Sequence, residues 1–582
     1  MVKFTGRIVL FNYCFFPITR LKSNLLKNKN VLEVKMSYID KIFPNPLPTV
    51  EEIETKYARR NLPEGAKVTR VAPSPTGFMH IGGIYAGLIN ERLAHQSGGV
   101  FFLRIEDTDT KREVEGATAV IYSSLAEYGL KVDEGFAGNG DEIGAYGPYR
   151  QSDRKEIYQA YIKHMLEIGK AYPCFATQEE LETLRKTQEA SGARPGYYGR
   201  WAKYRDYPVE KIEEKIDAGV PYVIRFKSNG NYNNKIVIQD GLKGKINFPE
   251  NDLDIVIMKS DGLPTYHFAH AVDDHLMGTT HVIRGDEWIS SLPLHIQLFK
   301  EMGFKAPKYT HIAPIQKMDN DSRRKLSKRH DPEADVRYYD TVGYPKQAVI
   351  EYLLNLANST FEGWRRNNPA AHYNDFKLEL NKLSPSGALF DFVKLNNISK
   401  EIISKMTTDE IYNNTYDWAK KNNSELLSLM EKNTDYIKAI LSIERTGAKN
   451  ARKDIAKYSD IPSEIEYFFD DKFTISDEMK NELKSVKNYA EIVEAYIPMF
   501  NENDSKDNWF AKMQQLADKF NFAKSGKEYK ANPEAFNGDI STLVKIFRIL
   551  ITGKTQSPDL SEIQHVMGKE RVLSRLNIVK NI

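Results

Sequence analysis

The chain has 582 residues, of which 41% are hydrophobic, 11% aromatic and 28% charged, a composition that supplies several apolar cores and excludes a largely disordered protein. At roughly 150 residues per domain, this length predicts three to five domains. The 82 basic and 79 acidic side chains leave a net charge of +3, and two cysteines, Cys14 and Cys174, exclude a disulfide framework and a four-cysteine zinc site.

The first 35 residues supply the whole positive surplus, because they contain seven basic side chains and one acidic side chain. The rest of the chain is therefore slightly acidic. The apolar stretch from Ile8 to Ile18 is interrupted by Asn12 and Pro17 and has no evident small-residue cleavage site, so it does not fit a secretory signal. Two interpretations stay open: an upstream start codon with Met36 beginning the functional chain, which we favour, and a basic presequence for an organelle. No apolar run approaches the roughly 20 residues of a membrane helix, so we expect no membrane partner.

A β–α–β unit is predicted after a breaker segment at 43–48 and a short helix at Glu51–Arg60. Lys67–Ala72 and Val100–Ile105 have the apolar character of buried parallel strands. Between them, a helix is predicted to begin near His80. Its apolar face is formed by Ile81, Ile84, Tyr85 and Leu88, at the i, i+3, i+4 and i+7 spacing of a helix. Gly98 and Gly99 are expected to end it. Such a unit is typical of an α/β domain with a right-handed crossover.

The segment 171–255 is less regular and indicates an insertion into this α/β domain, with short strands predicted at 221–227 and 235–239. The α/β pattern returns at 256–325. Beyond about 345 the apolar periodicity is helical and continues to the end of the chain.

A Pro/Gly loop connects the first strand to the helix that begins near His80. A helix start presents free backbone N–H groups and the positive end of the helix dipole, and both suit a phosphate. Gly82 and Gly83 would let a ligand approach the backbone closely, and His80 could donate a hydrogen bond to a phosphate oxygen. The alternative is that the two glycines serve only close helix–strand packing, and this segment alone does not decide between them.

A basic loop at Arg323–Arg329 contains Lys325 and Lys328. Lysines on a loop can supply charge to a transferring phosphate. An isolated basic run is more often a solvated loop, so the chemistry of this segment depends on what accompanies it.

Six segments of the chain resemble, in order, the motifs of the class I aminoacyl-tRNA synthetases, and within that class those of the glutamyl-tRNA synthetases of the bacterial type. The segments are Pro73–Gly83, Arg104–Asp109, Leu263–His267, Val272–Asp274, Val282–Trp288 and Lys325–Arg329. The similarity is dense from residue 68 to residue 345 and thinner but continuous beyond. Chance is a poor explanation for six ordered motifs.

The resemblance implies a class I fold: a catalytic domain with a Rossmann-like, doubly wound parallel sheet, an α+β insertion, and an all-α C-terminal anticodon-binding region. The expected boundaries are an N-terminal extension at 1–66, the two halves of the catalytic domain at 67–170 and 256–325, an insertion that binds the acceptor end of tRNA at 171–255, a stem-contact region at 326–400 and the anticodon-binding region at 401–582.

The implied activity is that of a glutamate–tRNA ligase. Glutamate and ATP give glutamyl-adenylate and pyrophosphate, and glutamate is then transferred to the terminal adenosine of tRNA(Glu) in translation. Positioning and electrostatic stabilisation, rather than a protein nucleophile, would supply the catalysis. Mg²⁺ is expected to accompany ATP. The sequence leaves open whether tRNA(Gln) is also glutamylated, and we expect a monomer in the cytoplasm.

By matching position, the resemblance assigns catalysis to His80, Lys325 and Lys328, and ATP binding to Thr76, His80, Gly82, Gly83, Glu287 and Lys328. It assigns glutamate binding to Arg70, Ala72, Ser74, Glu106, Tyr266, His270 and Arg284. Arg284 matches the family's arginine for the side-chain carboxylate, which suits the forked donors of a guanidinium. Glu106 matches a residue that faces the ammonium group. The plainer alternatives are a salt bridge for Arg284 and core packing for Tyr266.

The chain departs from the family pattern at two places. His270 stands where some members have a polar amide that contacts glutamate. Some bacterial members hold zinc in the insertion through cysteines, but Ala176 and Trp201 stand at two of those positions beside the remaining Cys174, so we expect no zinc.

A competing metal hypothesis comes from a group of possible ligands close together in the sequence: His267, His270, Asp273, Asp274, His275 and His281. Their spacing matches no dedicated zinc pattern, and several of them fall in the motifs above. We therefore expect no metal held by the protein.

RNA binding cannot rest on bulk charge, because residues 401–582 contain 27 basic and 29 acidic side chains. Arg445–Lys453 has four basic side chains and no acidic one, and is the best candidate tract for contact with the anticodon side of tRNA. A solvated helix end explains the same tract equally well.

Three rival hypotheses are a glutaminyl-tRNA synthetase, a short tRNA-modifying paralogue and a catalytically silent tRNA-binding protein. A buried arginine facing a neutral amide would leave a charge poorly paired, so Arg284 favours glutamate over glutamine. The long segment after the catalytic motifs disfavours the short paralogue, and the presence of His80, Glu287 and Lys328 disfavours the silent protein.

Overall fold

A computed structural model describes residues 38–582 except 110, 112, 139, 446–447 and 449–450. The predictions about a presequence and about a start at Met36 concern residues outside this part of the chain. The chain forms two compact units. Unit 1 contains most residues up to Ile312, and unit 2 contains residues 313–582 together with Phe78–Tyr85 and Ala126–Gly129.

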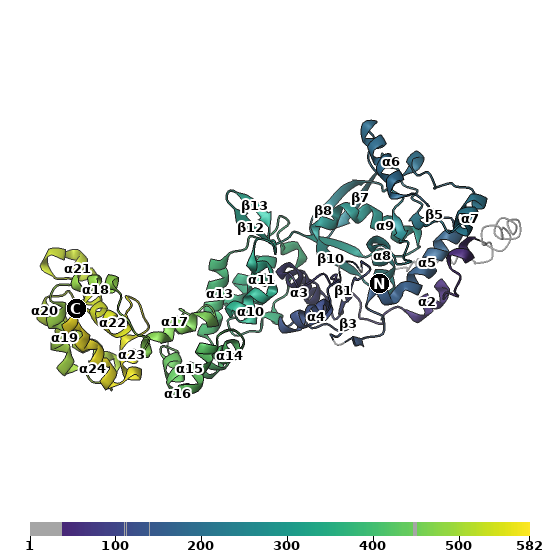
Figure 1. Cartoon of the computed structure of the whole chain (residues 1–582). Helices are drawn as coiled ribbons and strands as arrows, with labels where there is room; N and C mark the ends of the chain where they lie inside the picture. Colours follow the sequence, from purple (N-terminus) through teal and green to yellow (C-terminus); the bar gives the residue numbers. More distant parts are fainter. Residues whose placement is uncertain (1–37, 110, 112, 139, 446–447, 449–450) are drawn as a thin grey trace, which may run out of the picture. The chain divides into compact units, whose positions relative to one another are not determined.

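Unit 1 contains the predicted parallel sheet (Figure 1). Its strands β1 (Val68–Val71), β2 (Val100–Leu103) and β3 (Glu134–Phe136) are parallel, and β4 (Glu142–Ile143) adds an antiparallel edge. A second parallel pair consists of β10 (His281–Gly285) and β11 (Lys308–Ile312). Val68 at the start of β1 exchanges two hydrogen bonds with Thr280, just before β10, so the two groups of strands are neighbours.

Helix α3 (Ile81–His95) connects β1 to β2, as the sequence predicts. The four residues of its predicted apolar face, Ile81, Ile84, Tyr85 and Leu88, are all buried. After the helix, a Cβ atom on Gly99 would lie 1.9 Å from the carbonyl oxygen of Lys67. Only glycine fits there, because the backbone of the turn touches the start of β1.

The insertion between the two parallel groups has its own sheets. Strands β5 (Ala171–Cys174), β6 (Val223–Phe226) and β9 (Val256–Met258) form an antiparallel sheet, and β7 (Lys235–Asp240) and β8 (Gly244–Pro249) form a hairpin. The strands predicted at 221–227 and 235–239 are therefore confirmed. The insertion also contributes α6 (Gln178–Ala190) and α7 (Val209–Asp217).

One apolar core joins the insertion to the helices of unit 1, and it includes the buried Tyr158, Phe226 and Phe268. The other helices associated with unit 1 are α2 (Val50–Lys56), α4 (Ala117–Glu127), α5 (Lys155–Glu167), α8 (Tyr266–Leu276) and α9 (Leu292–Glu301). The helix predicted at Glu51–Arg60 is present but ends at Lys56.

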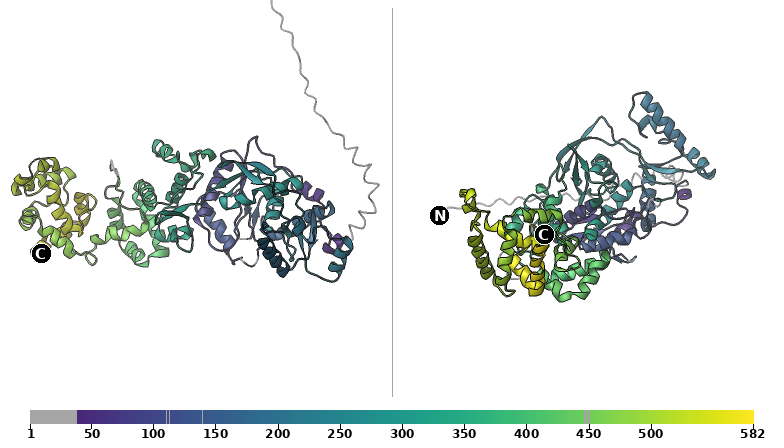
Figure 2. Two further views of the ribbon diagram at one scale, coloured as in Figure 1. Left: turned by 90° about the horizontal axis from the view of Figure 1, so that it is seen from above. Right: turned by 60° about the vertical axis from the view of Figure 1, so that its left-hand side comes forward.

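Unit 2 begins with an antiparallel hairpin, β12 (Gln316–Asp319) and β13 (Ser322–Lys325), and is otherwise helical in its described residues (Figure 2). Its helices are α10 (Val336–Val342), α11 (Lys346–Ala357), α12 (Phe361–Asn367), α13 (Phe392–Ser404), α14 (Thr408–Asn422), α15 (Ser424–Lys432), α16 (Thr434–Ser442), α17 (Ile461–Ile465), α18 (Asp477–Lys484), α19 (Tyr489–Tyr496), α20 (Lys506–Phe520), α21 (Gly526–Ala531), α22 (Ile540–Thr552), α23 (Leu560–Met567) and α24 (Lys569–Leu576).

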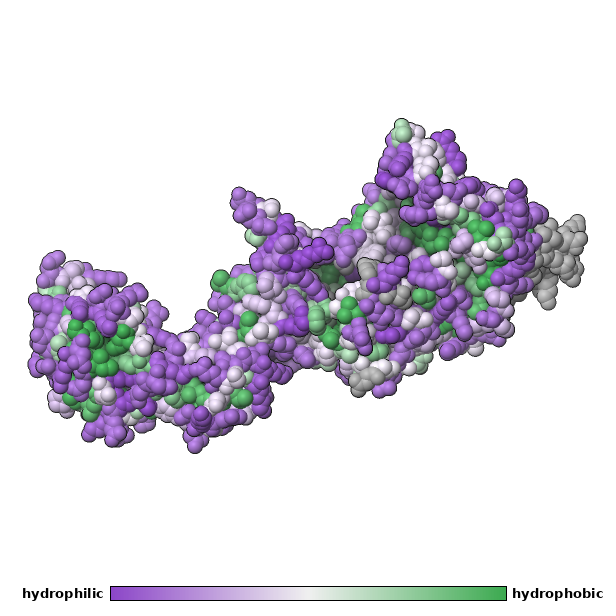
Figure 3. Space-filling view, in the orientation of Figure 1, coloured by the Kyte–Doolittle hydropathy of each residue, from purple (hydrophilic) through white to green (hydrophobic). Residues whose placement is uncertain are grey.

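The C-terminal helices share one apolar core that runs in sequence from Ile403 to Val579. Helix α22 is central to it, since Leu543, Ile546 and Leu550 are fully buried on one side of the helix. The face of the chain in Figure 3 is mainly hydrophilic, with smaller apolar areas. Within residues 38–582, no described helix combines the length and apolar composition needed to cross a membrane.

Candidate active site

The predicted glutamate-binding residues of unit 1 come from the carboxyl ends of parallel strands and from the start of α8. Arg70 lies on β1, Glu106 follows β2, and Arg284 lies on β10. Tyr266 and His270 lie on the first turns of α8. Ligands of α/β sheets bind outside the carboxyl ends of the strands, so a small substrate is expected at this edge.

A buried network of charges connects these elements. The Arg104 guanidinium donates to Asp274 (Nη1 to Oδ1, 2.8 Å) and to Glu106 (Nη2 to Oε1, 3.0 Å), and Arg70 Nε lies 3.4 Å from Asp274 Oδ2. Burial alone would raise the pKa of Asp274, but the two arginines hold it well below its usual value. Burial raises the pKa of Glu106 despite Arg104. A cationic group of a ligand beside Glu106 would offset that rise.

Arg284 is buried, with 6% of its surface exposed, and yet its Nη1 atom has no hydrogen-bond partner. Its Nε donates to His311 Nε2 (3.0 Å), and its Nη2 lies 3.1 Å from His295 Nδ1. Its guanidinium carbon lies 5.0 Å from the centre of the Tyr309 ring. A buried donor without an acceptor costs free energy, and a carboxylate is the acceptor that best suits a guanidinium.

The Trp288 ring also lies near this guanidinium, with its centre 5.9 Å from the guanidinium carbon. The Tyr266 ring lies 4.3 Å from the Trp288 ring, and it stacks on His270 at 5.9 Å. Burial raises the pKa of Tyr266 to about 12, so its hydroxyl stays protonated. His270 is fully buried, and its Nε2 lies 3.0 Å from the Tyr309 hydroxyl. In this structure the polar groups of His270 already face protein atoms beneath Tyr266.

The sequence did not single out His295 or His311, although both contact Arg284. His311 lies opposite Arg284 in the register of β10 and β11. Its only sequence signal was a histidine in a strand whose neighbours are mostly buried. The register that brings it to Arg284 depends on how the two strands pair, which no local pattern reveals.

His80, in unit 2, immediately precedes helix α3, as predicted. Its Nδ1 accepts the backbone N–H of Gly82 at 2.8 Å, so its proton lies on Nε2, which is 3.2 Å from the carbonyl oxygen of Leu326. Burial lowers the pKa of His80, and Lys328 and Lys325 lower it further. A Cβ atom on Gly82 would lie 3.0 Å from His80 Nδ1. Gly82 therefore leaves room for the ring of His80 at the helix start.

The basic loop is close to this helix start within unit 2. The Lys328 ammonium donates to the carbonyl oxygen of Phe78, and burial lowers the pKa of Lys328. Asp331 fixes the loop from the other side, because it accepts from Arg324 Nη2 (2.8 Å) and from the backbone N–H of Ser327 (2.9 Å). The loop and the His80 segment therefore form one group of donors. Lys325, at the end of β13, is exposed.

The remaining predicted residues belong to more exposed segments. Ser74 and Thr76 are exposed in the loop after β1, where the backbone N–H of Thr76 donates to the carbonyl of Ser74 at 2.8 Å. Ala72 is partly exposed. Glu287 is exposed in a short 3₁₀ helix, η5 (Asp286–Ser291), directly after β10. Their side chains are accessible, and their roles remain predictions.

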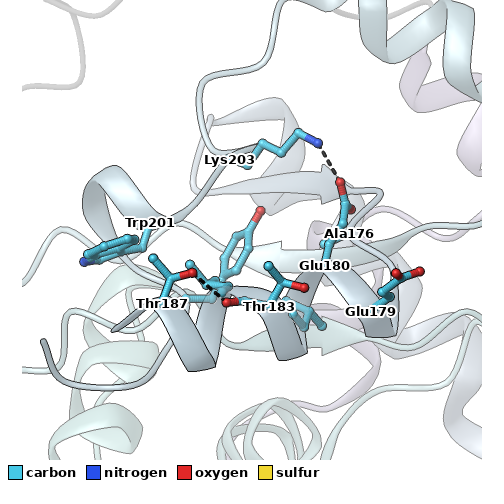
Figure 4. Close-up of a pocket in the computed structure, with 10 residues that line it drawn as sticks. Ala176, Glu179, Glu180, Thr183, Thr187, Trp201 and Lys203 are labelled. Carbon is cyan, nitrogen blue, oxygen red and sulfur yellow. Dashed lines mark hydrogen bonds and ion pairs between the residues drawn. The ribbon is translucent and has the colours of Figure 1, made fainter. Parts of the chain in front are cut away.

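The metal hypothesis finds no support in the described residues, since no group of three or more His, Cys, Asp or Glu side chains is placed to hold an ion there. In the insertion, Cys174 is buried and its Sγ lies 3.5 Å from the Tyr197 hydroxyl. Ala176 and Trp201 line a pocket of about 390 Å³ beside α6 (Figure 4). Its walls are mostly apolar, and Lys203 bonds Glu180 at its edge.

The interpretation of Arg445–Lys453 as an RNA-binding tract is wrong for its two arginines. Arg445 is buried, and its Nη1 donates to the carbonyl oxygen of Ile403 at 2.6 Å. Arg452 is also buried and donates to Asp454. Lys453 pairs with Glu401, and Lys449 lies outside the described residues. A count of charges could not show that both arginines are buried and hydrogen-bonded within the fold.

Two family models match the chain. The model for "tRNA synthetases class I (E and Q), catalytic domain" matches residues 67–396, and the model for "Anticodon binding domain" matches residues 410–580. Together they cover the α/β fold, the hairpin β12–β13 and the C-terminal helices.

The chain is also similar to named proteins along most of its length. A glutamate–tRNA ligase of Clostridium perfringens (strain 13 / Type A) is 51% identical over 538 residues, which are 92% of this chain and 98% of that protein. The glutamate–tRNA ligase of Sorangium cellulosum (strain So ce56) is 46% identical over 557 residues, which cover 90% of this chain and 97% of that protein. The crystal structure of a glutamate tRNA ligase from Elizabethkingia meningosepticum CCUG26117, in complex with its amino acid, is 28% identical with a TM-score of 0.70, and covers 88% of this chain and 99% of that one.

Two histidines of the site and His95 on α3 should have pKa values far from the usual 6.5 of histidine. Burial lowers the pKa of His267 and of His270 to about 4, whereas hydrogen bonds to Asp133 and Glu91 raise the pKa of His95 to about 9. Ring ¹³C shifts of histidine-labelled protein, assigned with single His→Gln variants, should show the first two rings neutral at pH 6 and His95 charged. A midpoint near 6.5 for either site ring would contradict this arrangement.

The same shifts predict two opposite effects of pH on stability, because an unfolded histidine titrates near 6.5. Because His267 and His270 have lowered pKa values, the free energy of unfolding should decrease as pH falls from about 6.5 towards 4. The stabilising contribution of His95 is complete below about pH 6.5 and is lost as pH rises through 9.

Proposed function

The chain belongs to the glutamate–tRNA ligases, a family of class I tRNA synthetases, and from this premise we propose how its residues divide the reaction. The enzyme uses ATP to activate glutamate as glutamyl-adenylate, releases pyrophosphate, and transfers glutamate to the terminal adenosine of tRNA. Residues of unit 1 recognise the amino acid. Residues of unit 2 bind the phosphates.

The observation that carries the amino-acid assignment is the unpaired Nη1 of Arg284. This buried, positively charged group lacks one acceptor, and the side-chain carboxylate of glutamate supplies it. Glu106 faces the ammonium group, and Arg70 adds positive charge for the carboxylates. Tyr266 covers the aliphatic part of the substrate, with His270 packed beneath its ring. Ala72 and Ser74 complete the pocket at the end of β1.

Phosphate binding is assigned to the start of α3 and to the basic loop. The positive end of the α3 dipole and the positive charge of Lys328 stabilise the negative charge that grows on the phosphoryl oxygens during attack on the α-phosphate. His80 fixes the geometry of that helix start through Gly82, with Gly83 beside it. Lys325 adds charge from the same loop. Thr76 and Glu287 contact other parts of ATP.

Mg²⁺ is typical of ATP in this family. The described residues contribute no group of three or more carboxylate, histidine or cysteine side chains for an ion. Mg²⁺ that accompanies a nucleotide is usually bound by the phosphates, several waters and one or two carboxylates, and no step is assigned to a metal held by the protein.

The RNA-binding roles follow the order of the segments. We assign the insertion at 171–255 to the acceptor end, residues 326–400 to the stem, and the helices of 401–582 to the anticodon, where the anticodon-binding family model matches. The substrate is tRNA(Glu), and the enzyme works as a cytoplasmic monomer. Whether tRNA(Gln) is also glutamylated is measured in the experiment below.

Pyrophosphate exchange tests the activity and separates the rivals. Purified protein is incubated with ATP, labelled pyrophosphate and either glutamate or glutamine, with and without tRNA(Glu). We expect exchange with glutamate that requires tRNA. Exchange with glutamine alone would identify a glutaminyl enzyme, and no exchange under any condition would favour a silent tRNA-binding protein. Charging of tRNA(Gln) with labelled glutamate in parallel determines the range of tRNA substrates.

Lys328→Ala should lower the rate of glutamyl-adenylate formation more than about tenfold, which corresponds to over about 1.4 kcal/mol of transition-state stabilisation. The ammonium group that would neutralise the phosphoryl oxygens is then missing. Lys56→Ala, at the exposed end of α2 and outside the segments assigned to glutamate, ATP and tRNA, is the matched control and should leave the rate unchanged. Equal rates for Lys328→Ala and the wild type would remove Lys328 from the mechanism.

A further inference from the structure

Arg284 determines the protonation of the two histidines that touch it. A guanidinium has only donors, so every ring nitrogen that faces it must present a lone pair. His311 Nε2 accepts from Arg284 Nε at 3.0 Å, and His295 Nδ1 faces Arg284 Nη2 at 3.1 Å. Both rings must then carry their proton on the other nitrogen. Each ring is neutral, because a second proton would point at Arg284.

The other nitrogen of each ring has a partner that accepts this proton. His311 Nδ1 lies 2.7 Å from Asp240 Oδ2, at the end of β7 in the insertion. His295 Nε2 lies 2.9 Å from His267 Nδ1 on α8. Burial lowers the pKa of His295 and of His311, in agreement with neutral rings. Two chains of hydrogen bonds therefore lead to Arg284, one from the insertion and one from α8.

Asp240 is itself held firmly. Its Oδ1 accepts the backbone N–H groups of Leu242 and Lys243, both at 2.9 Å, and its Oδ2 accepts the backbone N–H of His311 at 3.1 Å. Asp240 and His311 are both buried. The turn between β7 and β8 thus fixes Asp240, Asp240 fixes the His311 ring, and the ring fixes Arg284 Nε.

We propose that His311 and His295 are positioning residues that orient Arg284 for recognition of the glutamate side chain. They occupy Nε and one N–H of Nη2, set the plane of the guanidinium, and leave Nη1 for the substrate carboxylate. Because both rings are neutral, neither cancels the charge of Arg284 as a direct carboxylate partner would. The inference rests on the proposed function and adds the origin of its selectivity for glutamate over glutamine.

The test compares substitutions that keep or remove each acceptor. His311→Gln can place an amide oxygen near the former Nε2 position, and His295→Asn can do so near the former Nδ1 position. His311→Phe and His295→Leu fill the space without an acceptor. His281→Phe is the control, because His281 lies on the same strand as Arg284 but takes no part in the two series of hydrogen bonds that lead to Arg284. Thermal unfolding of each full-length variant shows whether it is folded.

Aminoacylation kinetics with tRNA(Glu) then give KM and kcat for glutamate and KM for ATP. We expect His311→Phe to raise the glutamate KM about tenfold or more with little change in kcat or in the ATP KM, because a charge-assisted hydrogen bond that orients Arg284 is lost. His311→Gln should recover most of the loss, and the preference for glutamate over glutamine should fall only in the Phe variant. At the second histidine, His295→Leu should likewise raise the glutamate KM and His295→Asn should recover most of the loss. This pair tests the inference if His311→Phe does not fold.

Three results would overturn the inference while the wild type is active with glutamate. They are an unchanged glutamate KM in both acceptor-free variants, a parallel rise in the ATP KM, and equal losses in the Gln and Phe variants at His311. A wild type that is inactive with glutamate would overturn the proposed function, and this inference with it.

Discussion

Burial of the Arg284 guanidinium imposes a strict requirement on unit 1. A buried cation is costly unless its N–H groups are paired, and Arg284 meets this requirement incompletely. His311 and His295 take two of its donors, and Nη1 has no hydrogen-bond partner among the described residues. In the proposed function this unmet pairing is the source of specificity, because the ligand that completes it best is an anion. A neutral amide would leave part of the cost in place.

The proposed glutamate site also contains a buried network of charged side chains. Arg104 donates to Asp274 and to Glu106, and Arg70 also lies against Asp274, so the strands β1 and β2 are connected to α8 by buried ion pairs. Asp274 is held ionised by its arginines, whereas the pKa of Glu106 is raised by burial. Removing one member of such a buried network leaves an unpaired charge. The same residues that stabilise the fold therefore also set the charge of the proposed glutamate site.

Sequence patterns predicted the parts of this account that depend on local order. The face of α3 formed by Ile81, Ile84, Tyr85 and Leu88 is buried as its spacing predicts, and His80 stands at the helix start. The motif around Arg284 and the all-helical C-terminal region also agree with the family. These features are encoded within a few residues of one another, so periodicity and motif order are sufficient to find them.

The contacts that orient Arg284 could not be predicted in this way. His311 is brought to it by strand pairing, and Asp240 reaches His311 from an insertion 71 residues earlier in the chain. Charge counting failed at Arg445 and Arg452 for a related reason, because a buried arginine that donates to a backbone carbonyl or to a neighbouring carboxylate looks the same in the sequence as one on the surface. The most direct test of the whole account is the ratio of kcat/KM for glutamate to that for glutamine in Arg284→Gln and wild-type protein. The account predicts a loss of glutamate preference of more than about 100-fold, and an unchanged ratio would contradict it.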